Sequence, residues 1–189
     1  SLFFNNNLYR GNRSSKVYAD GFDAFDSPNM PPLLETAIDI RLIAGNIEDK
    51  SHKEVTLKKI TPQPIGVIHL YPGISSLLIE NVIRQPVKAL IIRSYGVGNA
   101  PQDPDLLNCL AKAHQQGIII INSSQCLKGT VNMGGYATGS ALHDCGVIGA
   151  KDMTLEATLT KLHFLLSQEL GVDNIRELMQ KSLCGELTA

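Results

Sequence analysis

Apolar runs alternate with helix-length amphipathic segments along much of this chain, and no other feature constrains the fold as strongly. In chain order, the pattern predicts a strand at residues 65–70, a helix at 75–84, a strand at 88–92, a helix at 104–116 and a strand at 118–121. Strands joined by crossovers of this length lie parallel. Unbroken Val/Ile/Leu runs are typical of parallel strands buried on both faces. We therefore expect an α/β domain with a parallel sheet and flanking helices.

Local signals mark the ends of the predicted helices. Asp103 can accept hydrogen bonds from the first free N–H groups of its helix, and Pro104 stands at the first helical position, where a missing N–H costs nothing. Gly117 can adopt the left-handed conformation that ends this helix. Further along, leucines recur every three or four residues, which predicts a longer helix that ends at Gly171. A last amphipathic helix is predicted at residues 172–182.

The beginning of the chain has a different organisation. Residues 1–44 contain short apolar runs separated by turn formers, which predict a hairpin at residues 2–9 and a strand at residues 38–42, the last strands of a larger α/β domain. The polar residues 45–60 are predicted to be a linker, and residues 61–189 a second domain. Because the chain opens on an aromatic run with no polar leader, we expect it to be the carboxyl-terminal part of a longer protein.

Composition excludes several classes of function. With 43% apolar and 19% charged residues, the sequence is typical of a globular protein, and its net charge of −1 gives no basic field for nucleic acid. No apolar stretch is long enough to span a membrane. The cysteines show no metal-ligand spacing, so we expect no metal site, four buried free thiols and a cytoplasmic location. They are Cys109, Cys126, Cys145 and Cys184.

The most informative loop is the segment 93–101, which follows the buried run 89–92. Ligands of α/β proteins bind beyond the carboxyl ends of the strands. Arg93 ends a strand that we expect to be buried, so its charge needs an anionic partner. That partner could be an internal carboxylate such as Asp103 or Asp144, or the α-carboxylate of a bound amino acid, which a guanidinium can grip with two hydrogen bonds. The polar loops after the strands favour binding of a small zwitterion.

Several longer motifs resemble the bacterial cytoplasmic, type I L-asparaginases. The matching segments are LFFNNNLYRGNR at 2–13, ITPQPIGV at 60–67, YPGI at 71–74, RSYGVGNAP at 93–101 and VNMGGYATG at 131–139. The resemblance implies a flavodoxin- or Rossmann-like small domain. It also implies an amidohydrolase that converts asparagine to aspartate and ammonia through an acyl-enzyme on a threonine, without metal or organic cofactor.

The resemblance further implies a homo-oligomer, a dimer or tetramer, in which each active site lies between the large domain of one subunit and the small domain of its neighbour. In this family the nucleophile belongs to a Thr-Gly-Gly-Thr loop near the amino terminus. Neither a Thr-Gly-Gly nor a Thr-Asp-Thr string occurs in the 189 residues. We therefore expect that this chain holds no catalytic nucleophile, that an amino-terminal domain is missing, and that the chain alone is inactive.

Three residues are candidates for binding amino acids. Asn99 resembles the asparagine that reaches into the neighbouring subunit's site and contacts the substrate amino group, although an asparagine here could instead serve a turn. The type I enzymes respond cooperatively to asparagine. This resemblance suggests that Arg93, Asn99 and Cys126 line a second, regulatory site for asparagine.

Two alternatives remain open at this point. The related tRNA-dependent amidotransferase subunit uses the same module to release ammonia for a partner, but the near-neutral charge argues against that function. A non-catalytic, flavodoxin-like module that binds an amino acid is the other possibility.

Overall fold

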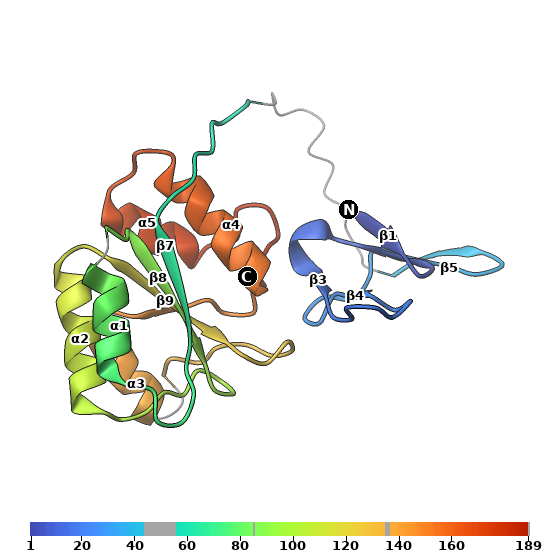
Figure 1. The fold of residues 1–189 in the computed structure, drawn as a ribbon. Coiled ribbons are helices and arrows are strands. Elements are labelled where there is room, and N and C mark those ends of the chain that lie inside the picture. The colour runs from blue at the N-terminus through green and yellow to red at the C-terminus, as the bar shows by residue number, and fades with distance from the viewer. Residues whose placement is uncertain (44–55, 85, 135–136, 189) are drawn as a thin grey trace.

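The computed structural model describes residues 1–43, 56–84, 86–134 and 137–188. The centre of its α/β domain is a four-stranded sheet (Figure 1). The strands are β7 (Ile65–His69), β8 (Ala89–Ser94), β9 (Ile119–Ser124) and β10 (Ile148–Gly149). They follow the order β10-β9-β8-β7, and every neighbouring pair is parallel. The α/β class and the parallel sheet predicted from the sequence are therefore confirmed.

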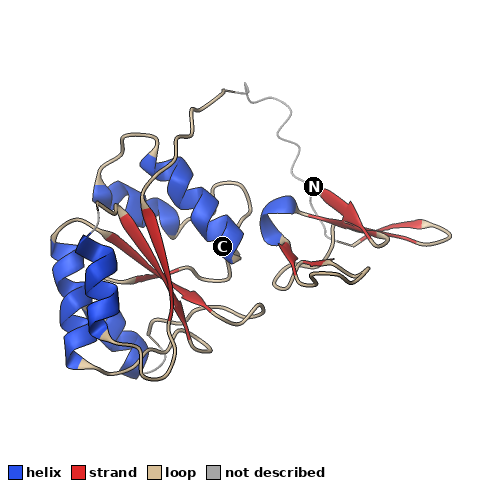
Figure 2. Cartoon of the chain, in the orientation of Figure 1, coloured by secondary structure: helices blue, strands red, loops and turns tan. Residues whose placement is uncertain are grey.

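Helices cover both faces of this sheet (Figures 1 and 2). On one face lie α1 (Ser76–Arg84), α2 (Pro104–Gln115) and α3 (Ala137–Asp144), and on the other lie α4 (Leu155–Leu166) and α5 (Val172–Met179). All six residues of β8 are buried. Leu90 and Ile92 pack into the core on the first face, whereas Ala89 and Ile91 pack into the core on the second. Full burial of each such Leu or Ile side chain contributes about 1.5–3 kcal/mol.

The helix ends agree with the predicted signals in α2 and differ in α4. Asp103 Oδ1 accepts a hydrogen bond from Asp105 N at 2.9 Å, and Gly117 adopts a φ of 83°, as predicted. The prediction that the leucine-striped helix ends at Gly171 is wrong, because α4 ends at Leu166. Glu169 takes the left-handed conformation after it, with a φ of 54°, and Gly171 directly precedes α5 with a φ of −64°.

Residues 1–43 form a separate group of short strands. β1 (Leu2–Phe4), β2 (Asn7–Tyr9), β5 (Leu34–Thr36) and β6 (Ile40–Leu42) make an antiparallel sheet in the order β1-β2-β5-β6. β3 (Ser15–Lys16) pairs with β4 (Phe25–Asp26), and the 3-10 helix η1 spans Gly11–Arg13. The predicted hairpin and the predicted strand near residue 40 are thus present. Most of the predicted linker falls on residues 44–55, outside the described residues.

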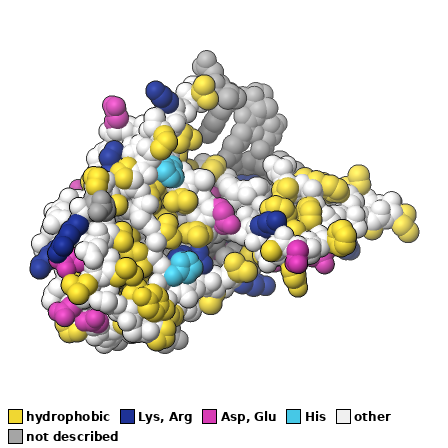
Figure 3. Space-filling view, in the orientation of Figure 1, with side chains coloured by type: hydrophobic (Ala, Val, Ile, Leu, Met, Phe, Trp, Pro, Cys, Tyr) yellow, Lys and Arg dark blue, Asp and Glu magenta, His cyan; other side chains and the backbone are white. Residues whose placement is uncertain are grey.

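Hydrophobic side chains gather on the surface of residues 1–43 (Figure 3). Phe22 and Ile38 are almost fully exposed, and Phe3, Ile40 and Leu42 are more than half exposed. Large exposed apolar surfaces of this kind mark interaction sites. None of the described helices is both long and apolar enough to cross a membrane.

Candidate ligand-binding site

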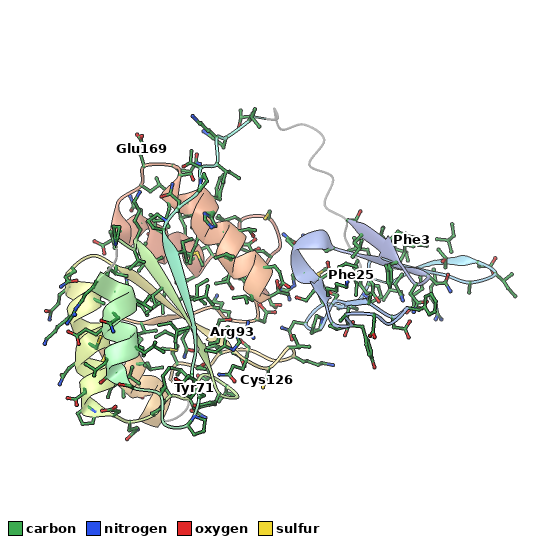
Figure 4. The ribbon with its side chains drawn as sticks, viewed as in Figure 1. Phe3, Phe25, Tyr71, Arg93, Cys126 and Glu169 are labelled. Carbon is green, nitrogen blue, oxygen red and sulfur yellow. The ribbon has the colours of Figure 1, made fainter. Side chains whose placement is uncertain are left out.

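A small cavity of about 140 Å³ lies beyond the carboxyl ends of β8 and β9. The α/β domain and residues 1–43 both contribute to its wall. Its lining residues are Ser15, Lys16, Asn29, Arg93, Ser124, Cys126, Leu127, Gly129, Lys151, Met153, Thr154, Leu155 and Glu156. Arg93 and Cys126 lie on the side of the domain that faces residues 1–43 (Figure 4). The cavity is thus an interface site rather than a pocket within one domain.

Arg93 brings a buried positive charge to this cavity. It is the penultimate residue of β8, the residue is 8% exposed, and its Nε has no hydrogen-bond partner among the described residues. Burial lowers the pKa of Arg93, while the nearby Glu156 and Cys126 raise it. Within the described ranges, neither Asp103 nor Asp144 forms an ion pair with Arg93, so the internal partners considered from the sequence are not used. A buried guanidinium with a free N–H is suited to a ligand carboxylate.

The opposite charge comes from Glu156, in the first turn of α4. Its Oε2 accepts a hydrogen bond from Ser15 Oγ at 2.8 Å, which fixes the carboxylate beside the cavity. Lys16 and Lys151 add positive charge to the wall. A cavity that holds a carboxylate and a guanidinium whose Nε has no partner among the described residues can hold both charges of a free amino acid.

A buried ion pair holds the two walls of the cavity together. Arg13 Nη2 lies 2.6 Å from Asp152 Oδ2, and Arg13 also donates hydrogen bonds to the Asn29 and Glu186 carbonyl oxygens and to Thr188 Oγ1. Burial raises the pKa of Asp152, but the hydrogen bonds from Arg13 and Thr188 outweigh it and lower the pKa overall.

Asn29 extends this connection into the cavity itself. Its Nδ2 donates to Asp152 O at 3.0 Å, and its Oδ1 accepts from Gly129 N at 2.7 Å. The position of the amino-terminal wall is therefore set by the α/β domain.

Asn99 lies in a tight turn that directly follows β8. Tyr95 N donates to Asn99 O at 2.9 Å, and Asn99 N donates to Tyr95 O at 2.8 Å. Asn99 does not adopt a positive φ, so the conformational tolerance of asparagine is not needed at this position. It is not among the residues that line the cavity. Arg93 and Cys126 line the same cavity, whereas Asn99 lies outside it, and an effector-binding role for these residues stays a prediction.

Several residues that line the cavity were not predicted from the sequence, among them Ser15, Asn29, Ser124, Lys151 and Glu156. Lys151 adopts a φ of 54°, which is uncommon for a residue with a side chain, but no sequence signal marks it. Glu156 does carry a signal, because it follows the Thr154 cap in a predicted helix, and Thr154 Oγ1 accepts from Ala157 N at 3.1 Å. Ser15 and Asn29 reach the cavity only through long-range packing.

The cysteines are free, although not all are buried as expected. Cys109 and Cys145 are partly buried, whereas Cys126 and Cys184 are exposed. Burial raises the pKa of the Cys109 and Cys145 thiols. The described residues contain no group of three or more His, Cys, Asp or Glu side chains placed to hold a metal ion.

Two family models match the chain. The glutaminase/asparaginase C-terminal domain matches residues 64–179, and the N-terminal asparaginase domain matches residues 1–47. The chain is 60% identical to L-asparaginase 1 of Escherichia coli strain K12 over 188 residues, which cover all of this chain and 56% of that protein. It therefore spans little more than half the length of this relative.

A solved structure and a more distant relative also resemble this chain over nearly its whole length. The crystal structure of L-asparaginase I from Vibrio cholerae superposes with a TM-score of 0.94 at 56% identity, covering all of this chain and 57% of that one. One subunit of the glutamyl-tRNA(Gln) amidotransferase from Methanobrevibacter smithii is 33% identical over 181 residues, covering 95% of this chain and 41% of that protein. From the matching domain model and the shared fold, we conclude that the chain belongs to the glutaminase/asparaginase family, as a relative of the type I L-asparaginases.

Proposed function

We propose that this chain functions as part of an L-asparaginase, which hydrolyses asparagine to aspartate and ammonia. The 60% identity to L-asparaginase 1 of E. coli supports this assignment over an amidotransferase function, since the amidotransferase of M. smithii is only 33% identical. The family's threonine motifs are absent from the 189 residues, so the chain alone should release no ammonia from asparagine. Ammonia production by the purified chain above buffer background would overturn this part of the proposal.

Within such an enzyme, the chain supplies a regulatory site for free asparagine. The observation that carries this proposal is the buried Arg93, whose Nε lacks a partner among the described residues in a cavity that also holds Glu156. Arg93 would bind the α-carboxylate and Glu156 the ammonium group, with Cys126 at the wall. The proposal therefore keeps Arg93 and Cys126 as effector-binding residues and gives Asn99 a different role.

Asn99 is proposed to contact substrate bound in a neighbouring subunit of a cytoplasmic homo-oligomer. Its place in a turn beyond the carboxyl end of β8 supports an outward-reaching role. The exposed apolar surface of residues 1–43 supports association with further protein.

Calorimetric titration of the purified chain with L-asparagine tests the regulatory site. We expect one molecule to bind per chain and Arg93→Ala to weaken binding at least tenfold, because a charge-assisted hydrogen-bonded pair is lost. Arg84→Ala is the matched control, because Arg84 is exposed and pairs with Glu80, one turn earlier in α1. Failure of the unaltered chain to bind asparagine, or equal binding by Arg93→Ala, would reject the site.

A further inference from the structure

Two fully buried polar side chains of the central sheet carry oxygen atoms that lack a hydrogen-bond partner. Ser94 is the last residue of β8, Asn122 lies in β9, and both residues are 0% exposed. Neither Ser94 Oγ nor Asn122 Oδ1 has a partner among the described residues. Leaving a buried polar atom in this state is costly, and proteins pair nearly all such atoms with protein groups or with ordered water. The two atoms therefore indicate a partner that the chain itself does not supply.

Both side chains lie on the face of the sheet that α1, α2 and α3 cover. Successive residues of a strand point to opposite faces. Ile92 and Ile120, two positions before Ser94 and Asn122, pack into the core on that face. Arg93, between Ile92 and Ser94, points to the opposite face, and neither Ser94 nor Asn122 lines its cavity. The two unpartnered oxygen atoms thus belong to a separate place in the molecule.

The strand register sets the spacing between the two side chains. Ile92 pairs with Asn122, and Ser94 lies two residues further along β8. With strands about 4.8 Å apart and two residues spanning about 6.6 Å, the Cα atoms of Ser94 and Asn122 are about 8 Å apart. Two hydrogen bonds of about 2.8 Å to one shared oxygen atom span a gap of this scale between the side-chain ends. One small molecule can therefore bridge the two atoms.

The orientation of the Asn122 amide determines what this molecule must supply. Asn122 Nδ2 donates to Gly98 O at 2.9 Å, and a carbonyl oxygen can only accept, so the amide cannot be turned round. Asn122 Oδ1 therefore needs a donor, whereas the Ser94 hydroxyl can donate or accept. Both groups are neutral, so a charged ligand would lose its hydration here without a counter-charge. Water meets these requirements, because it is small and neutral and both donates and accepts.

We propose that one buried water molecule binds between Ser94 Oγ and Asn122 Oδ1 and holds the Asn122 amide in place beneath the turn at residues 95–99. The turn rests directly on this amide, since a Cβ atom at Gly98 would lie 3.0 Å from Asn122 Nδ2. Bound water fixes the other end of the same amide. The inference is independent of the proposed function, because it needs neither asparagine nor the cavity at Arg93.

A high-resolution crystal structure of the unaltered 189-residue chain tests the site directly. We expect one ordered water within about 3.2 Å of both Ser94 Oγ and Asn122 Oδ1. A direct hydrogen bond between the two side chains, or a site without solvent density, would overturn the proposal.

Magnetic relaxation dispersion of water oxygen counts long-lived internal waters in solution. Ser94→Val removes the hydroxyl and fills its surroundings with methyl groups, so this variant should hold one internal water fewer than the unaltered chain. Thr158→Val is the matched control, because Thr158 is equally buried and its Oγ1 already donates to Thr154 O at 2.8 Å. An unchanged number of waters in Ser94→Val would reject the site. If this variant does not fold, the crystal structure of the unaltered chain decides.

Hydrogen exchange tests whether the water supports the turn. Asn99 N donates to Tyr95 O at 2.8 Å within the turn. We expect the Asn99 amide to exchange about two- to tenfold faster in Ser94→Val, the factor that corresponds to one hydrogen bond of ordinary strength. The Ser167 amide, at the end of α4, should exchange at an unchanged rate. Faster exchange at both amides, or at neither, would reject the support of the turn even if one water is lost.

Discussion

Arg13 and Asp152, 139 positions apart in the sequence, form a nearly buried ion pair with 2.6 Å between Nη2 and Oδ2. The side chain of Arg13 is 3% exposed and that of Asp152 is 11% exposed. Asp152 also accepts hydrogen bonds from the backbone and the hydroxyl of Thr188. One carboxylate thereby joins η1, the loop before α4 and the carboxyl-terminal tail. The cavity depends on this junction, because Ser15 and Asn29, which line the cavity, belong to residues 1–43 together with Arg13.

We expect Arg13→Met to destabilise the chain by about 3–5 kcal/mol, because it leaves the Asp152 carboxylate buried without its partner. Urea denaturation followed by circular dichroism measures the change in the free energy of unfolding. Glu80→Ala serves as the control, since its pair with Arg84 is exposed on both sides, and it should change stability by less than about 1 kcal/mol. Equal, small changes in the free energy of unfolding for both variants would show that the pair of Arg13 and Asp152 does not join residues 1–43 to the α/β domain.

Much of the α/β domain was predictable, because its strands are buried on both faces and read as uninterrupted apolar runs. β10 and α3 were not predicted. β10 contains two residues, too few for any periodic pattern, and α3 includes Gly139 and Thr138, which have low helix propensity. The end of α4 was misplaced because Glu169, and not Gly171, takes the left-handed conformation.

The candidate site was predictable only in part, because some of its residues come from a distant part of the chain. Arg93 lies at the end of β8 and Cys126 follows β9, and because these strands are parallel neighbours, strand order alone brings the two residues to one edge of the sheet. Ser15 and Asn29 come from a different part of the chain, and the contacts that place them are made by Arg13, Asp152 and Gly129. No local pattern in a sequence encodes such long-range pairing.

Glu186 should make stability depend on pH in the acid range. Burial raises the pKa of this carboxyl, but hydrogen bonds from Lys161 and from the backbone N–H groups of Cys184 and Leu183 outweigh it and hold the pKa at about 2, below its usual 4.5. A folded-state pKa below the unfolded value stabilises the protein above the unfolded pKa. This contribution, on the order of 3 kcal/mol, is expected to be lost as the pH falls from about 4.5 towards 2.

Denaturation of the unaltered chain and of Glu186→Gln between pH 2 and pH 6 measures this effect. Glu186→Gln should be less stable at pH 6, because it leaves the buried Lys161 unpaired, and its stability should vary less with pH. Glu177→Gln is the control, since Glu177 and its partner Lys181 are both exposed. Parallel pH profiles for the unaltered chain and Glu186→Gln would contradict the assignment.

Glu156→Gln should weaken the binding of asparagine about tenfold, because it removes the charge proposed to face the ammonium group. Succinamate, which is asparagine without its amino group, should bind the unaltered chain and Glu156→Gln with similar affinity. Calorimetric titration of both proteins with both ligands measures the difference. Glu169→Gln provides a control, as Glu169 does not line the cavity. If Glu156→Gln weakens both ligands equally, Glu156 only shapes the cavity and does not recognise the amino group.

Asn99→Ala, in a full-length asparaginase that contains this chain, should raise the KM for asparagine about tenfold or more, because it removes a hydrogen bond to a charged ammonium group. Asn99 N and O pair with Tyr95 through the backbone, so the turn itself should survive the substitution. Steady-state kinetics and thermal denaturation are measured on the same preparation. The matched control is Asn108→Ala, since Asn108 lies on the exposed face of α2. An unchanged KM for Asn99→Ala with unchanged stability would remove the substrate role and leave Asn99 as a residue of the turn.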